Sequence, residues 1–150
     1  MQDPYSTPEA ALTEADADVG PPPALWNPDA AGAWSLLLTP VFGSILVLMN
    51  WNEIGDSDRA RTGKIWVAIS ILMLIPYMLV PGFALLYIII WYFSSQKPQT
   101  KYVKERWGKD YQRKGWLIPI FTAIGGFFAF FFVLGFVAAM FLPEFAESVG

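Results

Sequence analysis

The positions of the positively charged residues constrain this chain more than any other feature of its sequence. All ten Lys and Arg residues lie in two stretches, at 59–64 and 97–114, and residues 1–58 and 115–150 contain none. The sequence around both stretches is strongly apolar. In integral membrane proteins, Lys and Arg concentrate in the loops that stay in the cytoplasm. The pattern therefore predicts an all-α integral membrane protein with two cytoplasmic basic loops.

The amino-acid composition agrees with a membrane protein and disfavours several kinds of chemistry. Hydrophobic residues make up 55% of the chain and charged residues 15%, against about 25% charged residues in soluble domains. Cys and His are both missing from the sequence, which removes disulfides, thiol nucleophiles, zinc sites and the usual general base. Apart from Asp29 in the first turn of segment 28–49, the hydrophobic segments contain no Asp, Glu, Lys or Arg. We therefore expect a non-enzymatic protein without catalytic residues, metal or cofactor, and without nucleic acid as a partner.

The N-terminal part combines an acidic tail with a first hydrophobic segment. Residues 1–25 are rich in Pro, Ala and acidic residues, and we expect them to be disordered. The hydrophobic segment 28–49 follows, with Asn27 as a suitable N-cap and Pro28 at the first helical position. Its 22 residues would span about 33 Å, enough to cross a membrane. Because Pro40 lies within it, the sequence predicts one kinked helix.

The uncharged stretch 65–93 permits two interpretations. As one helix it would be longer than the hydrocarbon core of a bilayer and would need a strong tilt. Alternatively, the chain turns at Pro81-Gly82 and forms two short helical segments, 65–80 and 83–93. The two interpretations differ in the number of membrane crossings.

The last hydrophobic segment, 117–142, is long enough for one crossing and leaves a short C-terminal tail, 143–150. With four crossings both basic loops lie in the cytoplasm, whereas three crossings would place them on opposite sides of the membrane. The positive-inside rule favours four. We therefore expect a bundle of four hydrophobic helical segments, or three if 65–93 is one long helix. The N-terminus is expected on the side opposite the cytoplasm, which would be the periplasm for a bacterial inner membrane.

The second basic stretch is the best candidate for a surface that binds lipid or a partner protein. If it is helical, Val103, Trp107 and Tyr111 share one face. Glu105 is then placed to pair with Lys109. Such an amphipathic helix would lie in the membrane interface. Its aromatic rings would lie at the boundary of the lipid acyl chains, and its Lys and Arg side chains would contact lipid phosphates. A docking site for a cytoplasmic protein is the alternative. The candidate interface residues are Lys101, Lys104, Trp107, Lys109, Tyr111, Arg113 and Lys114.

Two pairs of small residues in the last segment point to close packing between helices. They are Gly125 with Ala129 and Gly135 with Ala139. This spacing lets two helix backbones approach each other closely in a membrane. Packing within one chain and packing between chains, including in a homo-oligomer, both fit the pattern.

Three stretches resemble a group of short bacterial inner-membrane proteins. The stretch WNPxAAxxWSLLxTPxFG, which starts at Trp26, resembles the opening of these proteins. The stretch QxKYVKERxG from Gln99 is similar to their basic loop, and DPYxxPxA from Asp3 is similar to the NPYxxPxA start of many small bacterial membrane proteins. The resemblance implies a multi-pass inner-membrane protein and supplies no catalytic residue.

Two classes of function remain. The first is a protein that packs its helices against a partner in the membrane. The most specific form of this hypothesis is an immunity protein against a pore-forming toxin, because small helical bundles without membrane-embedded charges resemble such proteins. The second is a subunit of an oligomeric channel or transport complex. The expected partners are a bilayer with anionic lipid at its cytoplasmic face and a membrane-inserted toxin or other membrane protein.

Overall fold

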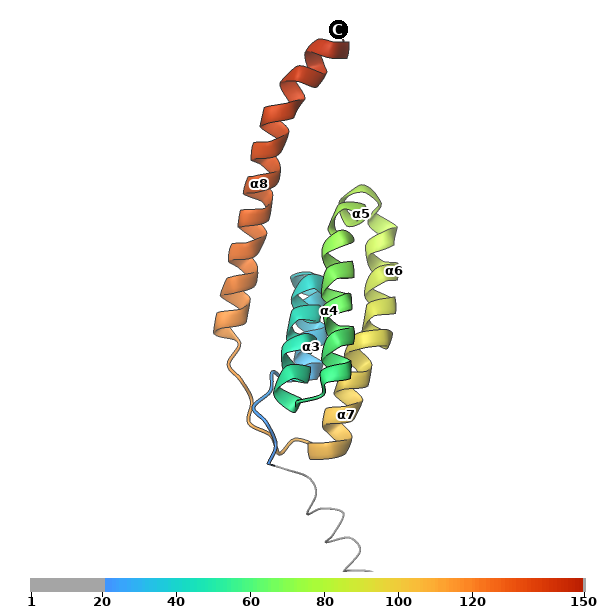
Figure 1. Ribbon diagram of the computed structural model, residues 1–150, viewed down its shortest axis with the longest axis vertical. Coiled ribbons are helices and arrows are strands. Elements are labelled where there is room, and N and C mark those ends of the chain that lie inside the picture. Colours follow the sequence, from blue (N-terminus) through green and yellow to red (C-terminus); the bar gives the residue numbers. More distant parts are fainter. Residues whose placement is uncertain (1–20, 150) are drawn as a thin grey trace, which may run out of the picture.

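The computed structural model describes residues 21–149, and this part of the chain is helical without strands. Of residues 1–25, which we expected to be disordered, residues 1–20 lie outside the described residues, and Leu25 is buried against the bundle. The helices in chain order are α2 (Pro28–Leu37), α3 (Pro40–Ile54), α4 (Ser57–Leu72), α5 (Leu74–Leu79), α6 (Pro81–Trp91), the π-helical turn η1 (Tyr92–Gln96), α7 (Lys97–Trp107) and α8 (Leu117–Val149) (Figure 1).

The first hydrophobic segment folds into two helices, so the expectation of one kinked helix is wrong. Helix α2 ends at Leu37, and Thr39 has an extended backbone with φ −173° and ψ 159°. The Thr39 hydroxyl then caps α3 by accepting a hydrogen bond from the Phe42 N–H. A proline disfavours the helical conformation of the residue before it and is well tolerated at the first position of a helix. Pro40 therefore begins a new helix after the chain has reversed.

The hairpin of α2 and α3 returns the chain to the end from which it started. The backbone N–H of Trp26, just before α2, donates to the side chain of Asn50, near the end of α3, at 3.0 Å. Gly43 near the start of α3 lies against Ser35 near the end of α2. With 10 and 15 residues, the two helices are about 15 Å and 23 Å long. Both are shorter than a bilayer core of ~30 Å.

The stretch 65–93 forms a second hairpin and not one long helix. Helix α5 forms the tip between α4 and α6 (Figure 1). Tyr87 of α6 packs against Trp66 of α4, with ring centroids 6.4 Å apart, and its hydroxyl lies 2.7 Å from the Ser70 hydroxyl. The reversal therefore lies just before the expected Pro81-Gly82 turn, because Pro81 is already the first residue of α6.

The chain then returns in one continuous rod, formed by α6, η1 and α7. It ends at Gly108, which has a positive φ of 60°. The segment 109–116 that follows runs beside the N-terminal residues 21–27, which we call the N-terminal strap. Leu25 of the strap donates to the Gln112 carbonyl at 2.9 Å and accepts from the Lys114 N–H at 2.9 Å.

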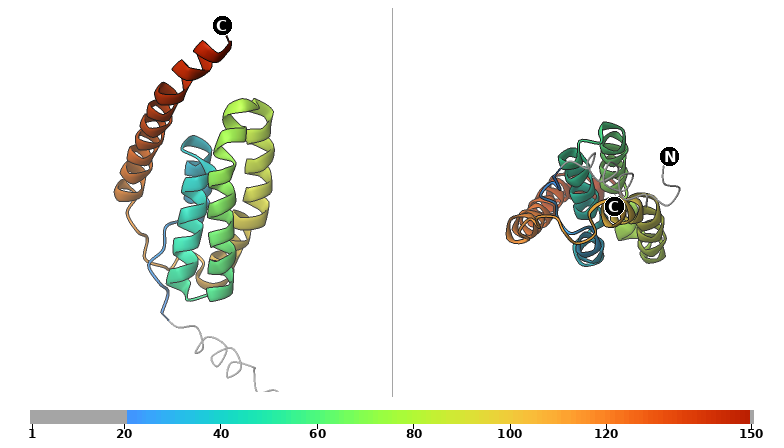
Figure 2. Two further views of the ribbon diagram at one scale, coloured as in Figure 1. Left: turned by 45° about the horizontal axis from the view of Figure 1, so that its top comes forward. Right: turned by 90° about the horizontal axis from the view of Figure 1, so that it is seen from below.

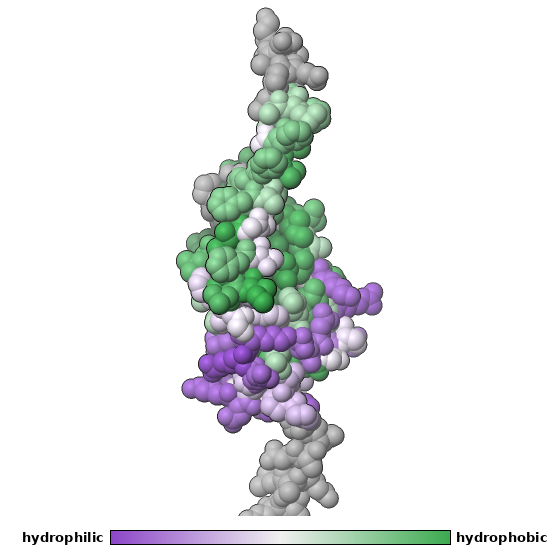
Figure 3. All heavy atoms as spheres, turned by 90° about the vertical axis from the view of Figure 1, so that its left-hand side faces the viewer, coloured by the Kyte–Doolittle hydropathy of each residue, from purple (hydrophilic) through white to green (hydrophobic). Residues whose placement is uncertain are grey.

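The N-terminal strap lies at the end of the bundle that carries both basic stretches, which we call the basic end. We expected the N-terminal side of the chain on the opposite side of a membrane from these stretches, whereas the described strap lies beside residues 112–114 of the second basic stretch. The physical reason is the α2–α3 hairpin, since an even number of passes brings the strap and the first basic stretch to the same end. Figure 3 shows the hydrophilic residues gathered in a band at this end, with hydrophobic residues above it.

Helix α8 stands to one side of the other helices (Figures 1 and 2). Its residues Leu117–Phe141 are long and apolar enough to cross a membrane, by length and composition, and this window is not buried inside the bundle. Near its start, Ala123 packs against a small cluster around Trp26 and Phe42. The helix continues to Val149, so the described part of the expected tail at 143–150 is helical.

Candidate functional site

Buried side-chain amides hold the N-terminal strap against the bundle. Asn50 accepts from the Trp26 N–H at 3.0 Å and donates to the Trp26 carbonyl at 2.9 Å. Gln99 of α7 accepts from Asn50 at 3.2 Å and donates to the Val47 carbonyl at 2.8 Å. Both amides are 0% exposed. Buried polar groups that are fully paired specify one arrangement of the elements that they join, here α3, α7 and the strap.

A third buried amide, Gln96, comes from the π-helical turn η1. Its Nε2 donates to the carbonyl of Pro28, the first residue of α2. Gly32 leaves room for this side chain, because a Cβ at position 32 would lie 3.4 Å from Cγ of Gln96. A π-helical turn is rare and is found mostly as a single turn inside an α-helix, frequently at functional sites. Here η1 interrupts the α6–α7 rod at the place where the rod contacts α2 and α3.

These three amides were not expected from the sequence, in which they stand at the ends of hydrophobic segments, close to the charged stretches. A signal was present in the spacing. Gln96 and Gln99 are three positions apart and therefore share one face of a helix. Asn50 is the first amide after the apolar run of α3. None of the three was among the candidate site residues.

A chain of hydroxyl groups joins α3, α4 and α6 inside the bundle. The Ser44 and Ser70 hydroxyls lie 2.9 Å apart, and the Ser70 hydroxyl lies 2.7 Å from that of Tyr87. Both serines are 0% exposed. Hydroxyls of this kind pair between helices where water is excluded. These hydroxyls are hydrogen-bond partners of one another, and they place no charge in the hydrophobic part of the bundle.

The aromatic residues of the second basic stretch pack inside the chain. Val103 and Tyr111 are buried against Leu25 of the N-terminal strap, and Trp107 packs on the same cluster. The expected single helical face is wrong for Tyr111, because α7 ends at Trp107 and Tyr111 lies in the extended segment beyond Gly108. The rings therefore contact the strap and do not form one exposed apolar stripe.

The end of α7 also changes the expected ion pair. Glu105 lies 3.7 Å from Lys101, four residues earlier, and not beside Lys109, because Lys109 is already beyond the helix. Both partners of this pair are largely exposed, so it contributes little to stability. The candidate residues with exposed side chains at the basic end are Lys101, Lys104, Lys109 and Arg113.

Lys114, which we expected to contact lipid or a partner, instead contacts two side chains of its own chain. Its Nζ lies 2.6 Å from Oε1 of Glu53 and 4.4 Å from the ring centroid of Trp26. A carboxylate and an aromatic face together hold the ammonium over the strap. On the same segment, burial raises the pKa of the Tyr111 phenol, while the neighbouring Arg113 opposes the shift. Tyr111 therefore stays neutral at physiological pH.

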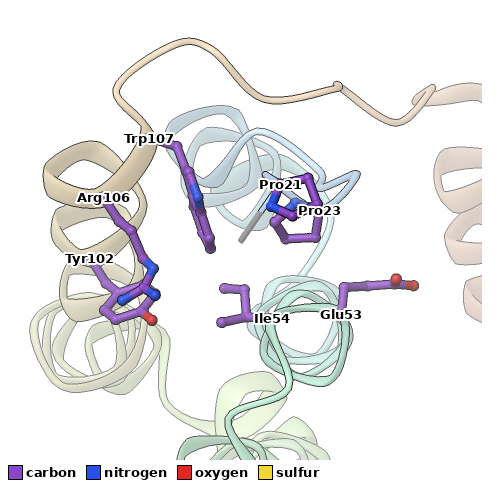
Figure 4. A pocket seen from close by; sticks show the side chains of 7 residues that line it. All are labelled: Pro21, Pro23, Glu53, Ile54, Tyr102, Arg106 and Trp107. Atoms are coloured by element: carbon purple, nitrogen blue, oxygen red, sulfur yellow. The ribbon is translucent and has the colours of Figure 1, made fainter. Parts of the chain in front are cut away.

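A pocket of about 180 Å³ opens at the basic end between the strap and α7. Figure 4 shows the Trp107 ring on one side of it and the rings of Pro21 and Pro23 on the other, with Ile54 between them. The remaining lining residues are Glu53, Tyr102 and Arg106. The Trp107 Nε1–H is buried and makes no hydrogen bond within the described residues. Five of its seven lining residues are proline, isoleucine or aromatic, and the other two, Glu53 and Arg106, carry opposite charges.

The four small residues of α8 that we expected at a helix contact are open to the surroundings in the described chain. A Cβ built at Gly125 or at Gly135 would meet nothing within 4 Å. Ala129 and Ala139 are exposed. With 3.6 residues per turn, the four positions lie within about 120° of the helix circumference. The packing of these residues inside one chain, which the sequence left open, is therefore not found among the described residues.

The described part of the chain contains no group of three or more His, Cys, Asp and Glu residues that could hold a metal ion. Its polar groups form structural clusters inside the bundle and a basic surface at one end. Comparison of the chain with family models, with curated proteins and with solved structures found no match.

Proposed function

We propose that this chain is a multi-pass protein of a bacterial inner membrane that binds the helices of another membrane protein through α8. It is neither an enzyme nor a conducting pore in this proposal. The single observation that carries the proposal is the exposure of α8. Its Leu117–Phe141 window is apolar, is not buried by the bundle and presents small residues on a face that contacts nothing within the described chain.

The proposed placement in the membrane follows from the charge distribution. The basic end, with the N-terminal strap, lies at the cytoplasmic face, as the positive-inside rule favours. The α4–α6 hairpin and α8 extend from it across the bilayer. The α2–α3 hairpin enters from the cytoplasmic side and returns to it, because its two ends lie together at the basic end, where Trp26 bonds to Asn50. Irregular backbone at its tip, around Thr39, is tolerable at such depth only where protein or water covers it.

The most concrete partner is a membrane-inserted pore-forming toxin, against which this chain would act as an immunity protein. Two observations support this version. Small residues let a second helix approach α8 closely, which is how helices associate in lipid. As a small helical bundle with uncharged hydrophobic segments, the chain also resembles proteins that protect bacteria against pore-forming toxins. The alternative, a subunit of an oligomeric channel or transport complex, would use the same face of α8 to assemble copies of the chain.

We expect that replacing Gly125 and Ala129 together by leucine will weaken protection at least about tenfold, since overpacking of a close contact costs about 1–3 kcal/mol. The measurement is the membrane potential of cells that express the variant with a pore-forming toxin encoded beside its gene. Unchanged insertion and accumulation of the variant must be shown in the same cells.

Gly126→Leu is the matched control for this experiment. It changes the same residue type at the same depth, but the position lies about 100° further around the helix. A Cβ there also meets nothing within 4 Å. Protection should survive this change. Equal loss in both variants would contradict a specific binding face, and selective single-channel conductance by the purified protein alone would favour the channel alternative.

A further inference from the structure

A groove of about 100 Å³ lies between the beginning of α4 and the π-helical turn η1. It is separate from the basic surface of α7 and from the exposed face of α8. Seven residues from α3, α4, η1 and α7 line it. They are Trp51, Arg59, Thr62, Gly63, Ser94, Ser95 and Pro98.

Arg59 is held in a defined orientation at this groove. Its guanidinium carbon lies 4.8 Å from the ring centroid of Trp51 and 4.6 Å from that of Tyr102. Its Nε lies 3.5 Å from Asp56, and the side chain is 49% exposed. Two aromatic contacts fix the plane of the guanidinium without using its terminal N–H groups. A fixed planar fork of N–H donors is suited to a phosphate, which it can bind through two hydrogen bonds.

Two serines of the π-helical turn line the same groove. Ser94 and Ser95 both belong to η1 and both line the groove. The extra residue of a π-helical turn changes which side chains a helix presents, and such turns are frequent at functional sites. Here the turn brings two serines into the lining of the groove that also contains Arg59. The donor set of one arginine and two serines is typical of a site for a phosphate oxygen.

The surroundings of the groove favour a lipid as the source of that phosphate. Exposed apolar side chains lie close in sequence to the residues of the groove. Phe93, which precedes Ser94 in η1, is 56% exposed, and Ile65, two residues after Gly63 in α4, is 54% exposed. Lys97, one turn after Phe93, lies 4.8 Å from the Phe93 ring and adds a second positive charge nearby. Figure 3 shows a polar band at the basic end that gives way to the apolar surface above it. A phospholipid presents its headgroup and its acyl chains at such a boundary.

We propose that the Arg59 groove binds the phosphate of an anionic phospholipid, with the acyl chains against the exposed apolar residues of α4 and α6. The site goes beyond the proposed function, because it uses a different face and a different ligand. It differs also from a general attraction of the basic end to anionic lipid, because it assigns the contact to one arginine and two serines. Free phosphate has the same recognition chemistry and is distinguished by the experiment.

The test is a titration of the full-length protein in detergent with phosphatidylglycerol, followed by native mass spectrometry. We expect Arg59→Gln to raise the dissociation constant at least about tenfold, because it removes charge-assisted hydrogen bonds to the phosphate. Arg61→Gln is the matched control, since Arg61 is an exposed cation on the same helix that does not line the groove. It should change the dissociation constant less than about twofold. Equal effects of the two variants would overturn the proposal.

A second variant keeps the proposal testable if Arg59→Gln does not fold. Ser94 is exposed, so Ser94→Ala removes one hydroxyl donor with little effect on the fold, and we expect about fivefold weaker lipid binding. Unchanged binding by Ser94→Ala would contradict the assigned donor set. Inorganic phosphate, added at the concentration of the lipid, should not displace it. Displacement at equal concentration would identify free phosphate as the ligand and overturn the assignment to a lipid.

Discussion

Replacing Gly43 by alanine should lower the free energy of unfolding by about 3 kcal/mol, the upper part of the range for overpacked cores. A methyl group at this position would overlap the Ser35 hydroxyl and lie 2.7 Å from Cζ2 of Trp91. Ser35 and Trp91 are both 1% exposed, so neither can move into solvent. The strain falls where α2, α3 and α6 meet, and all three helices would have to shift.

Unfolding of the purified protein in mixed micelles with increasing denaturing detergent measures this effect, with tryptophan fluorescence as the signal. Gly82→Ala is the control, because a Cβ at Gly82 meets nothing within 4 Å and alanine favours the helical conformation. Its stability should equal or slightly exceed that of the unchanged chain. If Gly43→Ala were as stable as this control, the close packing of α2 against α3 and α6 would be refuted.

Replacing Gln99 by leucine should have an effect of similar size, about 2–4 kcal/mol. The change keeps much of the side-chain volume but leaves one Asn50 N–H without its partner, and an unpaired buried group costs about 1–3 kcal/mol. It also removes the hydrogen bond from Gln99 to the Val47 carbonyl, which adds about 1 kcal/mol. The loss should also loosen the N-terminal strap, because Asn50 holds the backbone of Trp26.

Two readouts measure the Gln99 effect, namely the same unfolding titration and the rate of proteolysis of the strap in folded protein. Gln112→Leu is the matched control, since this glutamine is exposed. It should leave both readouts nearly unchanged. A Gln99→Leu protein with unaltered stability and an equally protected strap would show that the amide cluster does not hold the N-terminal segment.

Local sequence signals were sufficient for the parts of the fold that depend on composition and on proline. The long apolar run from Leu117 predicts α8, and the structure has a helix of suitable length and apolarity there. The Pro81-Gly82 pair indicates a chain reversal close to the one that the structure shows, because proline starts α6. In both cases the deciding residues are neighbours in the sequence.

Pro40 shows where such signals fail. A proline inside an apolar run is compatible with a kinked helix and with two separate helices, and the local sequence does not distinguish them. What stabilises the hairpin is distant in the sequence. Trp91 packs beside Gly43, and Gln96 donates to the Pro28 carbonyl 68 residues away. These contacts exist only when α6 and η1 have packed against α2 and α3.

The candidate site could be predicted only in part, because its contacts also join residues that are distant in the sequence. The basic residues of α7 are evident from composition, and several are exposed as expected. Tyr111 and Lys114 turned inward because Gly108 ends α7 and sends the chain along the N-terminal strap. The strap precedes the first helix and has no periodic pattern of apolar residues from which its position could be predicted. Its partners could therefore not be identified from the sequence.

The most direct test concerns the hairpin of α2 and α3, which we propose enters the membrane and leaves it on the cytoplasmic side. The chain has no native cysteine, so single cysteines at Pro22, Ser57 and Gly82 can be labelled without background. In intact cells, a membrane-impermeant thiol reagent should label Gly82→Cys only. Pro22→Cys and Ser57→Cys should react only after the inner membrane is permeabilised. Labelling of Pro22→Cys in intact cells, with Ser57→Cys protected, would show that residues 28–54 cross the membrane once and would contradict the proposed arrangement.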